Sequence, residues 1–508
     1  MNLKKKYIVN TSIALVLATI FVSPTFVGRY FGHMDFMQVL FLIMSPAQGG
    51  TIELSMVLRY IKIALPLYIV VIAFFMFSYY LSKNGHVYHT RFINKGKKYY
   101  LKLKNPKKLG RIMITLVLVV TLVRFDRQLG IINHIVRANR NTYIYEQHYV
   151  NPMKADLKWP DKKRNLIILN LESMEYGFND IKVDGQVEHL IPNLEKIANQ
   201  NISFSHNKNF GGAQSIAGTG WTVASLVAQA TGTPIQFTKL NVTYGEGDGF
   251  LPGVNSLGQL LQEQGYQNYF MAGSDANFGG REEFYRTHGD YIIRDTKYYK
   301  EIGKIPEDYN VFWGFEDEKL FEYAKEELLY ISKQEEPFNF TMLTVDTHFT
   351  DGYTDPSCLL EYETPYANAI KCSDGKVAEF LSWIQEQDFY DNTTIMITGD
   401  HLTMNYDFSK GVVADDRGIY NAFINSDFKS FAETRTKERE FSIIDHFPTT
   451  LASLGVEIKG DRLGLGTNLM SDKKTLLEEM GYDKLNEEIS KNSKYYNDVF
   501  IQTKSKKD

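Results

Sequence analysis

The chain has 508 residues and a formal net charge of −4. This length allows more than one domain, and the lack of net positive charge gives no reason to expect a nucleic-acid partner. Charge is unevenly distributed, because the stretch from Lys83 to Arg111 holds many basic residues and no acidic one. Beside apolar segments, such a stretch indicates which side of a membrane it occupies.

Three apolar segments within residues 1–125 predict a transmembrane region. They are Ile8–Val27, Ile63–Leu81 and the shorter Leu109–Val123, and a bilayer core takes about 20 helical residues. The first segment follows three lysines, so a signal peptide is the alternative. Its length and the lack of a small-x-small cleavage site favour an uncleaved helix. Met37–Met44 is too short to cross, and we expect it at the interface or packed on the other helices.

The positive-inside rule predicts the orientation of these spans. Lys4 to Lys6 and the basic stretch that ends at Arg111 both belong in the cytoplasm. Three spans then place everything after about residue 125 outside the membrane, whereas an even number would place it inside. We therefore expect a multi-pass protein of the cell (inner) membrane with an extracytoplasmic catalytic domain.

Residues 161–470 alternate apolar strands with helical patterns. Continuous apolar runs of this kind form central parallel strands, and their alternation with helices predicts an α/β fold with a doubly wound sheet. Residues 126–160 are expected to be a linker, and residues 471–508 a helical, peripheral tail. The predicted strands are Asn165–Leu171, Tyr269–Ala272, Phe338–Val345 and Thr393–Thr398.

Polar residues follow three of these strands. Glu172 comes after the first, Asp346 to His348 after the third, and Asp400 with His401 after the last. Ligands of such sheets sit beyond the carboxyl ends of the strands, so one crevice would gather these side chains. A glycine-rich turn also delivers Thr222 to the start of a helix. Hydroxyl, carboxylate and imidazole groups can together bind a divalent metal and activate a hydroxyl as a nucleophile.

The chain has two cysteines, Cys358 and Cys372, and both lie in the predicted catalytic domain. In a cytosolic protein they would be spare thiols. In an exported domain, a disulfide that closes this short loop is favoured. The choice depends on the topology of the membrane region.

Five motifs resemble the phosphoglycerol transferases that modify osmoregulated periplasmic glucans, within the lipoteichoic-acid-synthase and sulfatase superfamily. The match extends through nearly all of residues 145–470 and implies an alkaline-phosphatase/sulfatase-like fold. The family's longer members have a C-terminal extension that this sequence lacks, which leaves the acceptor open. The motifs are Asn170-Leu-Glu-Ser173, Gly218-Thr-Gly-Trp-Thr-Val-Ala224, Gly265-Tyr-Gln-Asn-Tyr-Phe270, Thr344-Val-Asp-Thr-His348 and Gly399-Asp-His-Leu-Thr-Met-Asn405.

The resemblance implies one divalent metal, for which we expect Mn²⁺, with Mg²⁺ and Zn²⁺ as alternatives that suit the same donors. Thr222 is the implied catalytic nucleophile, at a helix N-terminus that suits an anionic phosphate. Thr219, three residues earlier, is the alternative nucleophile, and both threonines could instead only cap the helix. The implied metal ligands are Glu172, Thr222, Asp400 and His401.

Three further residues have implied roles toward the substrate. His348 would contact the phosphate and act as general acid and base, with a purely structural histidine as the alternative. Arg281 occupies the position where related synthases hold glycerol phosphate, and a guanidinium suits bidentate phosphate binding. A surface arginine is the alternative there. Trp221 either lines the headgroup pocket or simply packs.

The resemblance implies a membrane-anchored transferase that moves glycerophosphate from phosphatidylglycerol to a hydroxyl of a glycan or polyglycerolphosphate. The reaction would pass through a covalent phospho-threonine. A phosphoethanolamine transferase with the same fold is the alternative enzyme, and a non-catalytic, membrane-anchored sulfatase-like binding module is the alternative from another class. A true sulfatase is disfavoured, because Thr222 cannot supply the formylglycine that sulfatases need.

Overall fold

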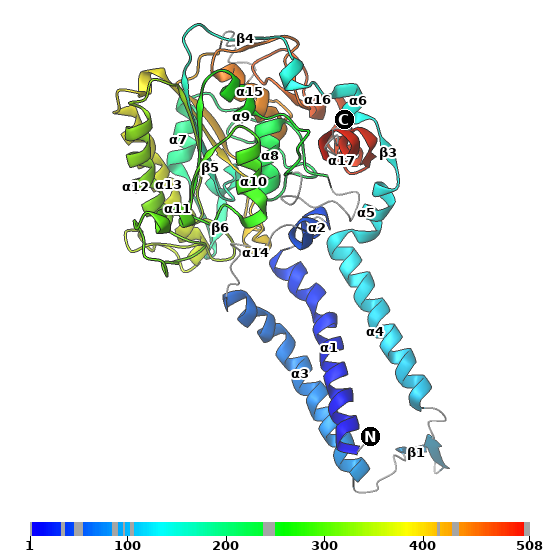
Figure 1. Ribbon diagram of the computed structural model, residues 1–508. Helices are drawn as coiled ribbons and strands as arrows, with labels where there is room; N and C mark the ends of the chain where they lie inside the picture. Colours follow the sequence, from blue (N-terminus) through cyan, green and yellow to red (C-terminus); the bar gives the residue numbers. More distant parts are fainter. Residues whose placement is uncertain are drawn as a thin grey trace. The chain divides into compact units, whose positions relative to one another are not determined.

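A computed structural model of the chain divides into two compact units (Figure 1). The helical unit consists of Met1–Met34 and Thr51–Ile132, and the sheet unit of Asp35–Gly50 and Asn133–Asp508. The structure describes residues 3–31, 36–44, 54–83, 90–94, 97–101, 106–236, 249–413, 417–428 and 436–501.

The helical unit is built from the long helices α1 (Leu3–Tyr30), α3 (Leu54–Lys83) and α4 (Pro106–Leu129), with a hairpin of β1 (Thr90–Asn94) and β2 (Lys97–Leu101). Helix α1 packs against both α3 and α4. Polar contacts accompany this packing, since the hydroxyls of Thr19 and Tyr68 lie 2.7 Å apart and Arg124 Nη1 donates to the Phe21 carbonyl.

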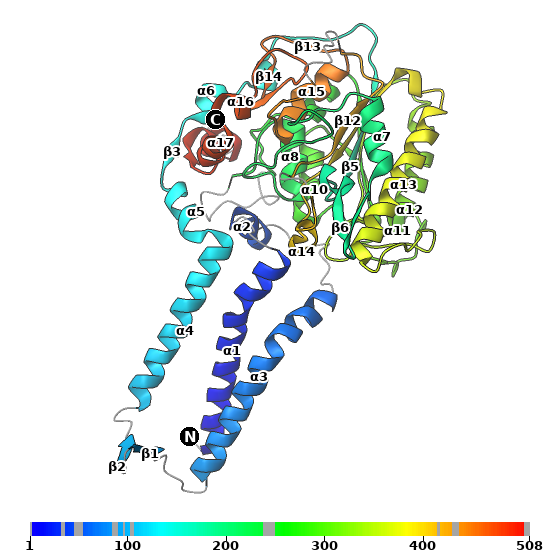
Figure 2. The same cartoon turned by 180° about the vertical axis from the view of Figure 1, so that it is seen from behind.

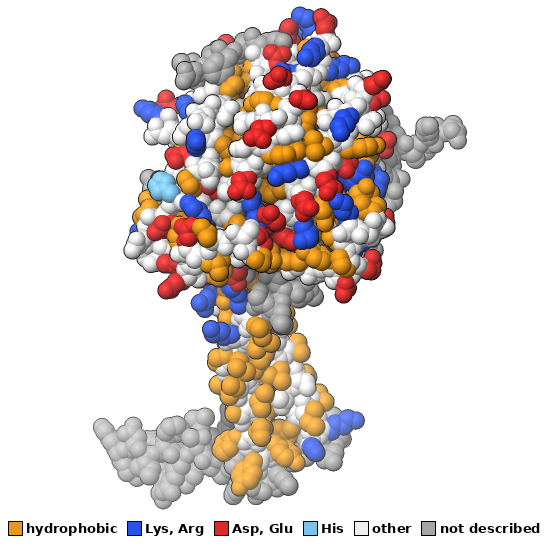
Figure 3. Space-filling model, turned by 90° about the vertical axis from the view of Figure 1, so that its left-hand side faces the viewer, with side chains coloured by type: hydrophobic (Ala, Val, Ile, Leu, Met, Phe, Trp, Pro, Cys, Tyr) orange, Lys and Arg blue, Asp and Glu red, His pale blue; other side chains and the backbone are white. Residues whose placement is uncertain are grey.

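Two helices among the described residues are long and apolar enough to cross a membrane, over Lys4–Tyr30 and Met56–Phe77. Large apolar side chains of this unit are exposed, such as Phe74 at 63% and Leu122 at 64%. On the face shown in Figure 3, hydrophobic side chains cover the visible helices, whereas acidic and basic side chains alternate over the sheet unit. The basic stretch from Lys83 to Arg111 lies outside the residues whose side chains the structure describes.

A six-stranded sheet forms the centre of the sheet unit, in the order β12-β11-β5-β10-β8-β9. Neighbouring strands are parallel except at the β12 edge, where β12 runs antiparallel to β11. The central strand β5 pairs with β11 on one side and β10 on the other. The strands are β5 (Asn165–Leu171), β8 (Gln267–Ala272), β9 (Ile292–Arg294), β10 (Phe338–Leu343), β11 (Thr393–Gly399) and β12 (Asn421–Ile424).

Helices cover both faces of this sheet (Figures 1 and 2). Successive residues of a strand point to opposite faces, so Leu166 and Ile168 of β5 lie in one hydrophobic core and Ile167 and Leu169 in the other. The doubly wound α/β sheet predicted from the sequence is therefore confirmed. The first core includes residues of α8 (Thr222–Thr231), α9 (Leu257–Glu263), α10 (Arg281–Thr287) and α15 (His446–Ser453), and the second includes residues of α7 (Pro192–Gln200), α12 (Asp317–Ile331) and α13 (Pro365–Gln385).

Segments from both ends of the chain complete the first core. The C-terminal tail is helical but not peripheral, because Leu485 and Ile489 of α17 (Tyr482–Ile489) are fully buried there. Tyr145 of α6 (Ile144–His148), inside the predicted linker, is buried in the same core. Helix α2 (Phe36–Met44) also packs here, because Met37, Leu40 and Phe41 belong to the same core.

Candidate metal and active site

Three neighbouring strands bring the predicted site residues together. Glu172 directly follows β5, Asp400 directly follows β11, and the segment that contains His348 follows β10. Hydrogen bonds join the segment after β5 to the segment after β10. The Glu172 amide donates to Thr344 Oγ1, and Thr347 Oγ1 donates to the Glu172 carbonyl. The carboxyl ends of parallel strands thus position the site, as the fold class requires.

Glu172, Asp400 and His401 form a compact, fully buried group. One ligand atom from each lies within 4.8 Å of the others. His401 Nε2 lies 3.4 Å from Glu172 Oε1 and 3.5 Å from Asp400 Oδ2. His401 Nδ1 bonds to the Leu402 carbonyl at 2.8 Å, which leaves Nε2 to face the carboxylates.

One oxygen of the Asp400 carboxylate has no hydrogen-bond partner among the described residues, although His401 Nε2 lies 3.5 Å from it. Its Oδ1 accepts hydrogen bonds from the Ser173 and His401 amides, both at 2.7 Å. Its Oδ2 is buried and has no hydrogen-bond partner among the described residues. A buried charged oxygen is costly without a partner. Two carboxylates and an imidazole that converge in this way could hold a divalent metal ion.

The pKa values of Glu172, Asp400 and His401 show that a positive charge is favourable at this site. Burial would lower the pKa of His401, but Asp400 and Glu172 raise it to about 10. Burial and the charge of Glu172 raise the pKa of Asp400 to about 7. Burial would also raise the pKa of Glu172, but its hydrogen bond to His401 and the charge of that ring lower it to about 2. A proton on His401 thus supplies positive charge that a metal ion would supply instead.

The Thr222 hydroxyl points into this group. Thr222 Oγ1 lies 3.3 Å from Glu172 Oε2 and 3.2 Å from His401 Nε2. Thr222 is the first residue of α8, and no side chain caps that end of the helix, so free amide groups and the positive end of the dipole lie beside the hydroxyl. The arrangement brings the predicted nucleophile and the three other predicted ligands to one point.

The Thr219 hydroxyl forms its hydrogen bonds with the backbone of Ile216. Thr219 is fully buried, and its hydroxyl donates to the Ile216 carbonyl at 2.8 Å and accepts from the Ile216 amide at 3.2 Å. The preceding Gly218 has a φ of +75°, and a Cβ atom there would lie 2.2 Å from the Ile235 carbonyl oxygen. Gly218 therefore shapes the turn, and the Thr219 hydroxyl stabilises it.

Arg281 begins α10 as a buried side chain rather than a surface one. It is 4% exposed, and its Nη2 donates to Ser274 Oγ at 3.1 Å and to the Asp275 carbonyl at 2.6 Å. Burial lowers the pKa of Arg281, and the nearby Glu172 charge opposes this shift. Nη1 has no hydrogen-bond partner in the described part of the chain, so the guanidinium keeps donors for an anion.

His348 is half-buried and lies next to Glu172, Asp400 and His401, the three residues that we call the metal-ligand group. Its Nδ1 bonds to the Phe349 carbonyl at 2.7 Å, which fixes Nε2 as the nitrogen available to a substrate. The charge of His348 helps to lower the pKa of Glu172, in addition to the larger effects of its other neighbours. The ring of Trp313 lies 4.4 Å from His348. Trp221, in contrast to the half-buried His348, is only 5% exposed, and the centre of its ring lies 5.4 Å from that of Phe41.

The sequence did not single out several residues that support the site. Ser173 lies beside Glu172 in its motif and donates through Oγ to Glu172 Oε1 at 2.8 Å. Arg417 forms a bidentate pair with the buried Glu175, whose Oε1 also accepts from the Thr403 amide. Their only sequence signal is proximity to a motif.

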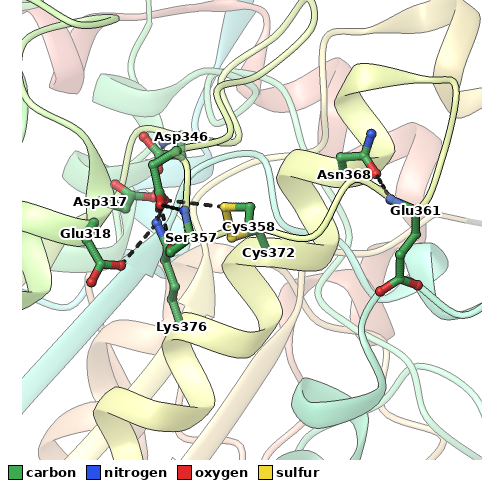
Figure 4. Close-up of a disulfide and its surroundings, with 10 residues drawn as sticks. Asp317, Glu318, Asp346, Ser357, Cys358, Glu361, Asn368, Cys372 and Lys376 are labelled. Atoms are coloured by element: carbon green, nitrogen blue, oxygen red, sulfur yellow. Dashed lines mark hydrogen bonds and ion pairs between the residues drawn. A yellow bond between two sulfur atoms is a disulfide. The ribbon is translucent and has the colours of Figure 1, made fainter.

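A second acidic group, in which Asp346 and Asp355 are buried and Glu318 is exposed, lies beside the disulfide between Cys358 and Cys372 (Figure 4). Lys376 of α13 forms ion pairs there with Asp355, with Glu318 at 3.4 Å and with Asp346 at 3.8 Å. Burial and the Asp317 charge raise the pKa of Asp346 well above its ordinary value. The Lys376 ammonium thus occupies the position where the carboxylates converge. We call this set the lysine cluster: Glu318, Asp346, Asp355 and Lys376.

The fold and the site define a member of the sulfatase family. The Sulfatase family model matches residues 164–456, more than half of the chain, and the chain belongs to this family. The fold is shared with a solved integral membrane protein, the lipooligosaccharide phosphoethanolamine transferase A of Neisseria meningitidis. The TM-score is 0.51 at 14% identity, with 89% of this chain and 84% of that chain covered.

Sequence relatives within the family include two enzymes named phosphoglycerol transferase I. The chain is 30% identical to the enzyme of Xanthomonas campestris pv. campestris (strain B100) over 318 residues, 61% of this chain and 43% of the relative. It is 30% identical to that of Escherichia coli O6:K15:H31 (strain 536 / UPEC) over 334 residues, 64% of this chain and 41% of the relative. The predicted relationship to phosphoglycerol transferases is confirmed, and the chain spans less than half the length of these relatives.

Proposed function

We propose that the protein transfers glycerophosphate from phosphatidylglycerol to a hydroxyl of a glycan or polyglycerolphosphate. One observation carries this proposal: the Thr222 hydroxyl, at a helix N-terminus, lies within 3.3 Å of both Glu172 and His401 in a buried site. Such a site suits attack by a hydroxyl on a phosphodiester. The relationship to phosphoglycerol transferase I supports glycerophosphate as the transferred group.

Glu172, Thr222, Asp400 and His401 are the residues that would hold one divalent metal ion. Mn²⁺ is the ion we expect, and Mg²⁺ or Zn²⁺ suits the same mixed oxygen and nitrogen donors. When bound, such an ion lowers the pKa of a hydroxyl and neutralises charge on a phosphate oxygen. Asp400 Oδ2, which is buried and accepts no hydrogen bond from the described residues, supports this assignment.

The reaction proceeds in two steps at Thr222. In the first, Thr222 Oγ attacks phosphorus, the bond to the diacylglycerol oxygen breaks, and His348 Nε2 gives that oxygen a proton. Glycerophosphate then remains on Thr222, whose own hydroxyl proton has passed to water. In the second, an acceptor hydroxyl attacks phosphorus and gives its proton to His348, and Thr222 Oγ leaves and takes a proton from water. Arg281 binds the phosphate throughout.

The donor lipid places the reaction at a membrane surface. We propose three spans in residues 1–125 and a sheet unit on the extracytoplasmic side of the inner membrane. Two apolar helices, over Lys4–Tyr30 and Met56–Phe77, support membrane anchoring. The third span, within α4, and the orientation rest on the sequence pattern.

The proposal is tested with full-length protein in detergent and Mn²⁺. Phosphatidylglycerol and phosphatidylethanolamine are supplied side by side, and diacylglycerol release is followed for the wild type and Thr222→Ala. We expect release from phosphatidylglycerol only, lost in Thr222→Ala. Release from phosphatidylethanolamine alone would identify a phosphoethanolamine transferase instead. Release from neither lipid, together with no tight metal binding that needs Asp400, would identify a non-catalytic module.

A further inference from the structure

Helix α2 comes from the chain between the two apolar helices but packs inside the sheet unit. Met37 and Phe41 are each 1% exposed, and Leu40 is 8% exposed. These residues share one hydrophobic core with Trp221 and Val223, which flank the Thr222 nucleophile. A segment far from the site motifs in sequence therefore takes part in the packing around Thr222.

Phe41 contacts two of the segments that form the site. Its ring lies 5.4 Å from that of Trp221. It also approaches Gly279, where a Cβ atom would lie 3.6 Å from Phe41 and 2.6 Å from Val223 Cγ2. Gly279 lies two residues before Arg281, and its φ of +67° suits glycine. The lack of a side chain at this position leaves room for both neighbours.

A third contact links α2 to the segment that carries the metal ligands. Gln38 is 6% exposed, and its Nε2 donates to Met404 Sδ at 2.9 Å. Met404 follows His401 by three residues. One helix thus touches the segments that present the nucleophile, the candidate phosphate-binding arginine and two of the metal ligands.

Packing, rather than a hydrogen bond of its side chain, holds Trp221. Its indole Nε1 is buried without a hydrogen-bond partner in the part of the chain that the structure describes. Trp221 is also the N-cap of α8, in an extended conformation and without a side-chain cap. Because Trp221 directly precedes Thr222, a change in the packing of the indole would move the nucleophile. Phe41 is the aromatic neighbour that α2 supplies.

We propose that α2 is part of the active site and that Phe41 is a positioning residue. It holds Trp221, and through Trp221 it keeps the Thr222 hydroxyl aligned with Glu172 and His401. The inference rests on the proposed role of Thr222. It has a consequence for the organisation of the enzyme, because residues 133–508 alone lack a component of the site. Catalysis is thereby tied to the segment between the two apolar helices.

The test uses the full-length protein and the variants Phe41→Ala, Phe41→Leu and Leu40→Ala. Leu40→Ala is the matched control, since it removes another buried side chain of α2 and leaves the Phe41 ring in place. Each variant is assayed with phosphatidylglycerol and with bis(4-nitrophenyl) phosphate, a phosphodiester without a lipid headgroup. Thermal unfolding with and without Mn²⁺ is measured for each.

A misplacement of about 1 Å can cost about a hundredfold in rate, so we expect Phe41→Ala to lower kcat at least about tenfold more than Leu40→Ala. KM and the Mn²⁺-dependent rise in Tm should change little, because the metal ligands stay in place. Phe41→Leu keeps most of the apolar volume without the ring, and it should retain a Tm close to that of the wild type with a lowered kcat. If Phe41→Ala does not fold, the kcat of Phe41→Leu tests the positioning role of Phe41 instead.

Equal loss of kcat in Phe41→Ala and Leu40→Ala at equal Tm would overturn the inference, because Phe41 would then be an ordinary core residue. Wild-type kcat in Phe41→Leu would overturn it as well. If the wild type cleaves the chromogenic diester but neither lipid, the proposed glycerophosphate donor is wrong. The comparison of Phe41 with Leu40 still stands on the diester assay in that case.

Discussion

Two acidic groups with buried carboxylates lie beyond the carboxyl ends of neighbouring strands, and they differ in what neutralises them. In the lysine cluster, the Lys376 ammonium pairs with the buried Asp346 and Asp355 and with the exposed Glu318. In the metal-ligand group, no lysine or arginine of the described chain forms an ion pair with Glu172 or Asp400. Burial makes an unneutralised carboxylate costly in both places. The lysine cluster thus contains its own cation, whereas Glu172 and Asp400 could accept the charge of an added metal ion beside Thr222, the proposed nucleophile.

The largest expected effect is a loss of activity, which should follow a substitution in the metal-ligand group but not one in the lysine cluster. Asp400→Asn removes a predicted metal ligand while keeping the shape of the side chain, and we expect diacylglycerol release to fall at least about a thousandfold. Asp355→Asn makes the same chemical change in the lysine cluster and should keep activity within about tenfold of the wild type. Comparable losses in both variants would contradict the distinction.

Removal of the Lys376 ammonium should lower the stability of the protein and leave metal binding unchanged. Lys376→Met leaves the buried carboxylates of Asp346 and Asp355 without their cation, and we expect a loss of about 3–5 kcal/mol in the free energy of unfolding. Lys410→Met, which breaks the exposed pair with Asp407, is the control and should cost less than about 1 kcal/mol. Denaturant titrations in detergent would measure both losses.

The stability loss in Lys376→Met should also depend on pH. Burial and Asp317 raise the pKa of Asp346 above its unfolded value, so the folded state binds this proton more tightly. Its contribution to stability is full at low pH and is lost as the pH rises through the folded pKa. The difference from the wild type should therefore narrow as the pH is lowered, and a difference that widens would argue against unpaired carboxylates as its cause.

The disulfide supports the loop that carries Asp355. Cys358 and Cys372 are separated by 14 positions, and closure of a loop of this size is worth about 3 kcal/mol. We expect the Cys358→Ser/Cys372→Ser double variant to lose about that much stability. A reducing agent should lower the Tm of the wild type similarly and leave the double variant unchanged. If the double variant also lost its response to Mn²⁺, the two acidic groups would not be independent.

The smallest effect is the stabilisation by metal ion itself. Binding to the folded state at one hundred times Kd adds about 2.7 kcal/mol, so Mn²⁺ should raise the Tm of the wild type and of Asp355→Asn alike. Asp400→Asn should show little rise. An equal rise in Asp400→Asn, or its loss in Asp355→Asn, would place the ion elsewhere.

The sequence predicted the central part of the fold well because buried parallel strands have a strong local pattern. β5 has the predicted bounds, and β8 and β10 differ by two residues at one end. The short strands β9 and β12 were missed, because runs of three or four residues are hard to distinguish from loops. Residues 471–508 were expected to be peripheral because they are rich in charged residues. Few apolar positions, such as Leu485, indicate contact with the core.

The candidate site was predictable where motifs lie at strand ends and at a helix start. Glu172, Thr222, Asp400 and His401 were expected together, and the structure brings them together. The contact of Phe41 with Trp221 was not predictable, because they lie 180 positions apart in the sequence. In addition, a short apolar segment beside membrane spans has the composition of an interfacial helix. Lys376 gives no local signal either, because a lysine within a helix is usually solvated.

The most direct test of the account is to identify the covalent intermediate. Wild-type protein is incubated with phosphatidylglycerol and Mn²⁺ without acceptor, quenched in acid, digested and analysed by peptide mass spectrometry. We predict one glycerophosphoryl group on Thr222, absent from Thr222→Ala. Diacylglycerol release without any adduct, or an adduct on Thr219, would contradict the role assigned to Thr222.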